Sequence, residues 1–385
     1  MTEKLYDMDS HLKAFTACVR SCVPDGERWA VTLDRTAFFP ESGGQYADTG
    51  LLGNARVLDV QETGGELVHY TDKPLTVGET VSGELDWMQR FRRMQNHTGE
   101  HILSGFVFRK YGYHNVGFHL ADGDMTVDFD GELNRAELDE LETLCNLAVA
   151  ENVPVICRYP APDELKTMEY RSKLDLTENV RIVEIQGYDL CACCAPHVER
   201  TGEVGSVKIL DFMRHRGGTR LKMLCGLDAM EDSRKRYQAT LEISGLLSVP
   251  QLDTPEAVRK LLENAEELKR QLAEARRTVL SMKAEALPVT DGNLTIFEPE
   301  LDMVSLRELV NAGMEKCGGI CAAFSGAEGD WKYIIGSRNV DLRAAAKTIN
   351  GALRGRGGGK PEMIQGSCTA SRQEIEAYFG GKGNS

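Results

Sequence analysis

The sequence has no long uninterrupted apolar run, and no stretch of it approaches the length that a bilayer span requires. Its first residues contain no basic segment followed by an apolar core, so they do not resemble a secretory signal. Its 11 cysteines are an odd number, which in a chain of 385 residues favours reduced thiols and a metal site over a disulfide framework. These absences predict a cytoplasmic protein with no membrane partner.

Positive charge is also scarce, because 45 lysines and arginines face 59 aspartates and glutamates, and the net charge is −14. Non-specific DNA coating needs a broad positive potential, so this balance argues against that class. The negative net charge is still compatible with a local basic surface that binds one structured RNA. The length exceeds what one hydrophobic core supports, so two or three globular domains are expected.

Two short segments carry residues suited to binding a metal. His97 and His101 lie four residues apart, and Cys193 and His197 repeat that spacing. Residues four apart share one face of a helix, so a single cation can reach both members of a pair. Imidazole nitrogen and thiolate sulfur suit zinc, and four such groups match its tetrahedral preference. The sequence therefore predicts Zn²⁺ held by these four residues, with Cys194 as the alternative to Cys193.

Residues 1–85 predict a small β-barrel, because short strand patterns alternate with turns. Strands are expected at residues 29–33, 55–61 and 67–70, and a helical period occurs only at residues 9–22. The pair Gly43-Gly44 permits either a plain hairpin turn or the close approach of a backbone or ligand.

Residues 86–226 predict an α+β domain, since strands and two long helices are mixed without regular alternation. The first helix is expected to begin near Asp86, a good N-cap residue. Asn134 and Glu137 have the spacing of a capping box and predict the start of the second helix. The expected strands lie at residues 116–119, 125–130, 155–159, 180–185, 205–210 and 219–224.

Residues 227–287 predict a helical arm. A helix over residues 228–247 is interrupted by Pro250, and Thr254-Pro255 begins a second helix that Pro288 ends. Apolar residues of this second helix repeat in steps of three and four, as in a coiled coil: Val258, Leu261, Ala265, Leu268, Leu272, Ala275, Val279 and Met282. This apolar seam must bury either against the preceding helix or against another subunit.

Residues 288–385 predict a compact C-terminal α/β domain, with a helix at residues 305–316 and strands at residues 320–324 and 331–335. Near its end lies the Gly-rich segment, residues 354–361, in which a lysine is followed by proline, so it is not a nucleotide P-loop. Exposed backbone N–H groups beside Arg354, Arg356 and Lys360 suit phosphate binding. A flexible surface loop is the alternative.

These motifs, in this order, resemble the editing half of alanyl-tRNA synthetase. The stretch from Thr36 to Gln45 resembles a motif of its N-terminal barrel, and the segment 357–365 resembles its small C-terminal domain. The His/His and Cys/His pairs resemble the zinc motifs shared with the editing domain of threonyl-tRNA synthetase. Without an adenylate-forming class II domain, the combination is similar to the free-standing AlaX proteins in their long form. The family often has Cys-Gly-Gly-Thr-His where this chain has residues 193–197, so Pro196 departs from its pattern.

The resemblance implies hydrolysis of the ester that joins a wrong amino acid, serine or glycine, to the 3′ end of tRNA(Ala). Zinc would polarise water, anchor the substrate or only organise the site. Thr36 and Gln45 are the candidate contacts for a serine hydroxyl, and such a contact spares alanine because unmatched buried polar groups are costly. Mischarged tRNA(Ala) is the expected partner, and a homodimer through the arm or the C-terminal domain is a further expectation.

Two other functions fit parts of the sequence. His97-Thr-Gly-Glu100-His101 also matches the inverted zinc-peptidase motif, with Glu100 as the base. Outside that motif, Glu100 is a candidate general base or an exposed helix glutamate. A non-catalytic tRNA-binding protein with structural zinc would bind tRNA without releasing the amino acid. Asp128 and Arg181 are further candidates for the pocket.

Overall fold

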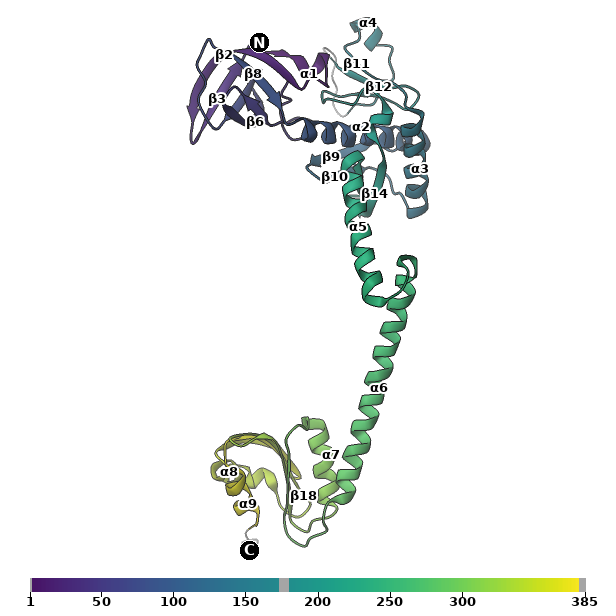
Figure 1. The fold of residues 1–385 in the computed structure, drawn as a ribbon. Helices are drawn as coiled ribbons and strands as arrows, with labels where there is room; N and C mark the ends of the chain where they lie inside the picture. Colours follow the sequence, from purple (N-terminus) through teal and green to yellow (C-terminus); the bar gives the residue numbers. More distant parts are fainter. Residues whose placement is uncertain (1, 173–179, 381–385) are drawn as a thin grey trace. The chain divides into compact units, whose positions relative to one another are not determined.

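The computed structural model describes residues 2–172 and 180–380. The chain divides into two compact units, one extending to Ile243 and the other beginning at Ser244 (Figure 1). Helices are mixed with several sheets, so the predicted α+β multidomain class is confirmed. Within the described ranges, no helix combines the length and apolarity that crossing a membrane needs.

The N-terminal unit begins with six strands that close into a barrel in the order β2-β3-β7-β6-β5-β8. Alternate residues of these strands are buried inside it, among them Val31 and Leu33. The strands are β2 (Ala14–Asp25), β3 (Arg28–Leu33), β5 (Gly50–Leu52), β6 (Ala55–Thr63), β7 (Glu66–Thr71) and β8 (Thr80–Leu85). The short elements β1 (Glu3–Lys4), α1 (Leu5–Met8) and β4 (Arg35–Thr36) complete this region, with β1 and β4 paired in parallel.

The helical period predicted at residues 9–22 is wrong, because most of this stretch belongs to strand β2. Phe15, Ala17 and Val19 are buried at every second position, which is the period of a strand. Residues 14–18 pair with β8 and residues 19–25 pair with β3. Pairing with distant strands therefore decides the conformation of a stretch whose local pattern is ambiguous.

The rest of the N-terminal unit packs two long helices against antiparallel sheets. Helix α2 (Trp87–Tyr111) and helix α3 (Arg135–Glu151) bury Ile102, Leu103 and Leu141 in a core shared with the four-stranded sheet. That sheet has the order β14-β15-β10-β9, with β9 (Asn115–Ala121), β10 (Asp124–Phe129), β14 (Val207–His215) and β15 (Gly218–Cys225). A second sheet contains β11 (Val155–Arg158), β12 (Ile182–Ile185) and β13 (Asp189–Ala192), and the short helices are α4 (Pro162–Leu165) and η1 (Thr201–Val204).

Helices α2 and α3 both begin where the sequence predicts. Of the two predicted caps, only that of α3 forms the expected side-chain hydrogen bonds. The capping box is confirmed: the Asn134 side chain accepts from the Glu137 N–H at 3.1 Å, and the Glu137 side chain accepts from the Asn134 N–H at 2.8 Å. Asp86 precedes α2 as expected, yet its side chain makes no cap hydrogen bond. Its carboxylate instead binds Thr49 and Arg56 in the barrel region, so it ties the helix start to the barrel.

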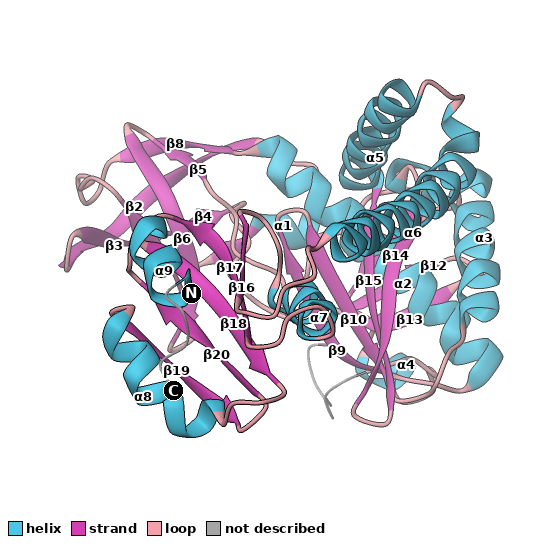
Figure 2. Ribbon diagram, turned by 90° about the horizontal axis from the view of Figure 1, so that it is seen from below, coloured by secondary structure: helices cyan, strands magenta, loops and turns pink. Residues whose placement is uncertain are grey.

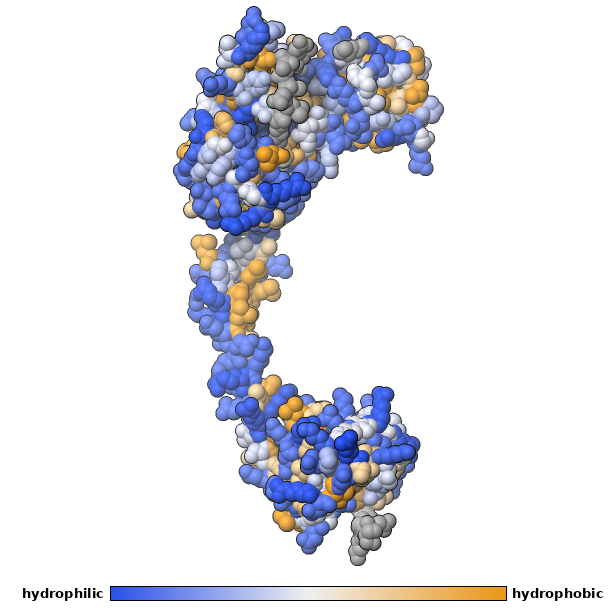
Figure 3. All heavy atoms as spheres, turned by 180° about the vertical axis from the view of Figure 1, so that it is seen from behind, coloured by the Kyte–Doolittle hydropathy of each residue, from blue (hydrophilic) through white to orange (hydrophobic). Residues whose placement is uncertain are grey.

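The predicted arm consists of α5 (Gly226–Leu247), the turn η2 (Gln251–Asp253) and the 33-residue helix α6 (Thr254–Ala286). Helix α6 begins at Thr254, as predicted, and Asp253 occupies its cap position. The six larger members of the apolar seam are exposed by 40–64%: Val258, Leu261, Leu268, Leu272, Val279 and Met282. Figure 3 shows orange apolar side chains at the surface along these helices.

The C-terminal unit contains a five-stranded sheet in the order β16-β17-β18-β20-β19. Its strands are β16 (Leu294–Glu298), β17 (Ile320–Ala327), β18 (Asp330–Ser337), β19 (Gly355–Lys360) and β20 (Met363–Cys368). Helices α8 (Leu342–Ala352) and α9 (Arg372–Gly380) lie on one side of the sheet, and α7 (Met303–Met314) lies on the other (Figure 2).

The Gly-rich segment is an edge strand, so neither a phosphate-binding loop nor a flexible surface loop describes its conformation. Residues 355–360 form β19 and pair with β20 throughout. A Cβ on Gly357 would lie 2.3 Å from the Gln365 carbonyl oxygen and 2.4 Å from the Tyr333 hydroxyl. Glycine is therefore required here because the neighbouring backbone and the tyrosine approach closely.

Candidate metal centre

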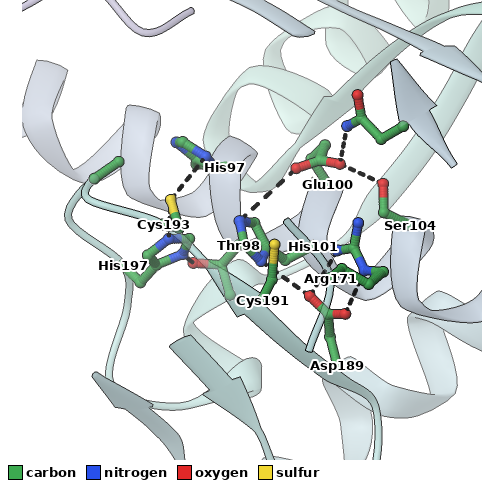
Figure 4. A network of polar contacts seen from close by, with 12 residues as sticks. His97, Thr98, Glu100, His101, Ser104, Arg171, Asp189, Cys191, Cys193 and His197 are labelled. Carbon is green, nitrogen blue, oxygen red and sulfur yellow. Dashed lines mark hydrogen bonds and ion pairs between the residues drawn. The ribbon is translucent and has the colours of Figure 1, made fainter. Parts of the chain in front are cut away.

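The four predicted metal ligands lie together in the N-terminal unit (Figure 4). Helix α2 presents His97 and His101, and the segment after β13 presents Cys193 and His197. One donor atom from each residue lies within 4.8 Å of every other. The Cys193 Sγ is 3.6 Å from His97 Nε2 and 3.4 Å from His197 Nε2. The three histidines are at most 4% exposed, and Cys193 is half-buried.

Only one of the two pairs uses helical spacing. His97 and His101 lie on α2, as expected, but residues 193–197 form no helix. An irregular turn brings Cys193 and His197 together instead. Cys194 is exposed, and its Sγ lies 3.6 Å from the Ser42 hydroxyl. The geometry therefore favours Cys193 over Cys194 as the thiol of the group.

Each histidine is oriented by a polar partner on its other ring nitrogen. The three contacts are His97 Nδ1 to Gln45 Oε1 at 2.9 Å, His101 Nδ1 to Asp189 Oδ2 at 3.0 Å, and His197 Nδ1 to Thr98 Oγ1 at 3.0 Å. Such partners fix the tautomer and the ring direction of metal-binding histidines. With Nδ1 engaged, Nε2 is left to face the shared space. Three imidazoles and one thiol in this arrangement fit the donor set that zinc prefers.

The partner of His101 is itself held by an arginine. Arg171 donates from Nε to Asp189 Oδ1 and from Nη2 to Oδ2, both at 2.7 Å. Burial raises the pKa of Asp189, but the hydrogen bonds from His101 and Arg171 outweigh it and hold that pKa below its usual value. The carboxylate is therefore charged and accepts the Nδ1 proton of His101.

The protonation of the buried ligands depends on a cation. Burial raises the pKa of the Cys193 thiol well above its usual value. Burial also lowers the pKa of His197, and His101 and His97 lower it further. The imidazole is thus neutral and ready to bind a metal, whereas the thiolate needs a nearby positive charge to be stable.

The barrel contributes Gln45 to the centre. The amide side chain is fully buried, and its Nε2 has no hydrogen-bond partner among the described residues. The preceding Gly44 has φ +86°, and a Cβ there would lie 2.3 Å from the Phe118 carbonyl oxygen. Of the two interpretations of the glycine pair, close backbone approach therefore holds at Gly44, and it lets the loop dock on β9.

Thr36 lies in β4 and is fully buried. Its Oγ1 is 2.8 Å from His69 Nε2 and accepts the Phe38 N–H at 3.1 Å. His69 Nδ1 is 3.2 Å from the Val31 carbonyl oxygen, which only accepts, so this nitrogen carries the ring proton. Burial lowers the pKa of His69 to about 4, so the ring is neutral and Nε2 accepts the Thr36 hydroxyl proton.

Glu100 is buried, so the interpretation of an exposed helix glutamate is wrong. Its Oε1 accepts from Ser104 and from Asn115 Nδ2, the latter at 2.6 Å, and its Oε2 lies 4.0 Å from His101 Nε2. Residues 93–105 of α2 are buried on every face, because sheets and loops surround this part of the helix. A single amphipathic stripe could not predict this.

The two further pocket candidates differ in what they touch. Arg181 donates from Nη1 to the carbonyl oxygens of Cys193 at 3.0 Å and Ala195 at 2.8 Å, so it holds the turn that carries the thiol. Asp128 pairs with Arg220 across the sheet at 2.6 and 2.7 Å.

The basic residues of the C-terminal unit are exposed on β19 and beside it. Arg354 Nη1 donates to Glu374 at 2.9 Å, so its charge is already paired. Arg356 and Lys360 lie within the edge strand, pairing with Ser367 and Met363 of β20.

Three family models match successive parts of the chain. "Threonyl and Alanyl tRNA synthetase second additional domain" matches residues 180–225, which include Cys193 and His197. "tRNA synthetases class II (A)" matches residues 11–89, and "DHHA1 domain" matches residues 291–378. The first of these covers half of the metal centre, the second covers the barrel strands and the third covers most of the C-terminal unit.

Named relatives match over almost the whole chain. The alanyl-tRNA editing protein AlaX-L of Pyrococcus horikoshii is 28% identical over 97% of this chain and 96% of its own. The alanyl-tRNA editing protein Aarsd1 of Danio rerio is 26% identical over 96% of this chain and 95% of its own. An alanine–tRNA ligase of Natronomonas pharaonis is 32% identical over 95% of this chain, which spans only 42% of that ligase. The two editing proteins match from end to end, so this chain is a homologue of proteins named as alanyl-tRNA editing proteins over nearly its whole length.

Proposed function

We propose that this protein is a trans-editing hydrolase that deacylates mischarged tRNA(Ala), chiefly Ser-tRNA(Ala) and also Gly-tRNA(Ala). The observation that carries the proposal is the buried group of three imidazole Nε2 atoms and one thiol beside Gln45. A purely structural zinc site would not need a buried amide donor without a partner next to it. The end-to-end similarity to proteins named as alanyl-tRNA editing proteins supports the choice of substrate.

Four residues would hold Zn²⁺: His97, His101, Cys193 and His197. Zinc bound there would supply positive charge that polarises the ester carbonyl or an attacking water. The unpartnered Gln45 Nε2 donates to the ester carbonyl oxygen, and the Glu100 Oε2 accepts the proton of the attacking water. Glu100 returns that proton to the 3′ oxygen of the tRNA as the ester C–O bond breaks. Gln45 and Glu100 are both buried, which strengthens these two contacts.

Discrimination against alanine follows from the Thr36 hydroxyl in this proposal. Because His69 takes the hydroxyl proton, Thr36 Oγ1 acts as an acceptor. A serine hydroxyl donates to it, and an alanine methyl group cannot. A site that depends on this bond rejects the analogue that lacks the hydroxyl strongly.

In this proposal the chain has four parts: a barrel over residues 1–85, an editing domain over residues 86–226, an arm over residues 227–287 and a C-terminal domain over residues 288–385. Arg354, Arg356 and Lys360 would contact tRNA phosphates, with Arg354 contributing least because Glu374 already pairs with it. A homodimer through the arm would cover the exposed seam of α6.

Single-turnover deacylation of Ser-, Gly- and Ala-tRNA(Ala) tests the proposal, with wild type, Cys193→Ala and Cys194→Ala. The expected result is rapid release of serine, slower release of glycine and retention of alanine. Cys193→Ala should abolish both releases, and Cys194→Ala should leave them unchanged. Binding of tRNA without release would instead favour a non-catalytic tRNA-binding protein. Cleavage of a peptide that Glu100→Gln abolishes would favour the zinc-peptidase alternative.

A further inference from the structure

Two buried arginines of α2 hold the loop that carries Gln45. Arg90 and Arg93 lie seven and four residues before His97, so all three side chains share one face of the helix. The two arginines are only 1% and 4% exposed. Such deeply buried guanidinium groups need several partners, so their contacts indicate what they organise.

Several of those contacts lie at the two ends of the loop, and Arg90 Nη1 also donates to the Ser10 carbonyl oxygen at 3.1 Å. Arg90 Nη2 donates to the Ala37 carbonyl oxygen at 2.6 Å, and its Nε donates to Asp48 at 2.9 Å. Arg93 Nη1 donates to the carbonyl oxygens of Ala47 at 2.5 Å and Tyr46 at 3.2 Å. The two arginines therefore hydrogen-bond the loop from residue 37 to residue 48 at its first residue and at its last three residues.

Gln45 lies directly before the residues that Arg93 holds. The other face of the loop is fixed by β9, where the Leu120 N–H donates to the Gly44 carbonyl oxygen at 2.7 Å. Arg93 also reaches the turn after β9, because its Nη2 donates to Asp122 at 2.9 Å. One guanidinium thus connects the helix of His97, the loop of Gln45 and the strand hairpin on which that loop rests.

We propose that Arg93, supported by Arg90, is a positioning residue that keeps the Gln45 amide on His97 Nδ1 and its Nε2 aimed at the substrate ester. The guanidinium fork is what the geometry requires, since it serves two carbonyl oxygens and a carboxylate at once. A lysine at this position offers one charged centre and cannot span the same three acceptors. The catalytic part of this inference rests on the proposed function, but the orientation of His97 does not.

The test measures zinc release from loaded protein to a chromogenic chelator in wild type, Arg93→Met, Gln45→Ala and the double variant. Loss of the partner of a metal-binding histidine typically costs roughly 10- to 100-fold in metal affinity, so both single variants should release zinc at least about tenfold faster. The double variant should be no faster than either single one, because both remove the same contact. Additive effects in the double variant, or wild-type release by Arg93→Met, would overturn the proposal.

Two further variants separate positioning from folding. Arg92→Met is the matched control on the same helix, because Arg92 pairs with Asp228 and Glu231 and not with the loop; it should leave zinc release unchanged. Asp122→Ala is the milder variant, since Asp122 is exposed and its loss only loosens Arg93; it should speed release less than Arg93→Met does. Equal acceleration by Arg92→Met would point to general destabilisation and contradict the positioning role.

Deacylation by the same variants provides the second measurement. The kcat/KM for Ser-tRNA(Ala) should fall in Arg93→Met and Gln45→Ala with the same lack of additivity. If wild type released no serine while the zinc results held, the proposed function would fail and the positioning of His97 would stand. If serine were released normally by Arg93→Met, the catalytic part of this inference would be wrong.

Discussion

The metal centre and the Gly-rich segment both stand out in the sequence, but they use polar residues in opposite ways. At the metal centre every histidine is buried and carries a second polar partner, and these partners come from the barrel, from α2 and from β13. On β19, Arg356 and Lys360 are exposed, and the neighbouring Arg354 is bound to a single exposed glutamate. Buried polar groups that depend on several distant residues should therefore be sensitive to substitution, and exposed ones should be tolerant.

His69 gives the largest expected effect, because it is a buried titratable group outside the ligand set. Its pKa is lowered to about 4, below the ordinary value of 6.5, so the unfolded chain binds a proton first as the pH falls. The contribution of the neutral His69 to the free energy of unfolding is thus fully present above pH 6.5. It is lost between pH 6.5 and 4 and amounts to about 3 kcal/mol in total. In urea unfolding at pH 7, 5.5 and 4.5, His69→Gln should lose less stability towards acid than wild type. Parallel losses in the two proteins would show that His69 does not contribute.

Asp189→Asn tests the partner of His101. The substitution removes the charge that orients the imidazole and leaves Arg171 buried without its counter-ion. Metal affinity should fall by roughly 10- to 100-fold, measured by competition with a chelator of known affinity. Glu184→Gln on the neighbouring strand is the control and should retain wild-type affinity. A loss confined to protein stability, with metal affinity unchanged, would argue against the role of Asp189.

The effect of Asn134→Ala should lie between those at the metal centre and those at the Gly-rich segment, because the capping box is local and half exposed to solvent. Removing the side-chain acceptor leaves the Glu137 N–H unsatisfied and should cost about 1 kcal/mol of stability in urea unfolding. Asn134→Asp keeps an acceptor oxygen and should cost much less. An equal loss in both variants would mean that the cap hydrogen bond is not the cause.

The Gly-rich segment gives the smallest expected effects. Arg356→Gln and Lys360→Gln should leave stability near wild type, and each should lower the slope of log tRNA affinity against log salt by about 0.9. Arg354→Gln should change that slope less, because Glu374 already compensates its charge. The measurement is tRNA binding between 50 and 300 mM salt. An Arg354→Gln effect as large as that of Lys360→Gln would contradict the difference between paired and unpaired exposed cations.

The sequence predicts well those features that depend on the spacing of nearby residues. His97 and His101 follow from one turn of a helix, and the start of α3 follows from a three-residue capping pattern. Gln45 follows from a motif rather than from geometry, and Cys193 follows from a four-residue spacing to His197 that the structure realises without a helix. In contrast, Asp189, Arg171 and Thr98 carry no distinguishing spacing, and their importance appears only when distant segments meet. No rule of sequence spacing could have found them.

Contacts between distant residues also account for the predictions about the fold that are wrong. Strand β2 has an ambiguous local pattern that its partners β3 and β8 resolve. The Gly-rich segment has the composition of a loop but pairs along β20, and at Gly357 the facing backbone and Tyr333 leave no space for a Cβ. Glu100 has the charge of a surface residue but is surrounded on all sides. In each case a contact between residues far apart in the sequence overrides the local preference.

The most direct test of the metal centre is the absorption spectrum of the protein loaded with Co²⁺. One thiolate and three imidazoles around the cation should give a sulfur-to-cobalt charge-transfer band in wild type and in Cys194→Ser. Cys193→Ser should lose that band. Persistence of the band in Cys193→Ser, or its loss in Cys194→Ser, would contradict the ligand set on which the proposed function depends.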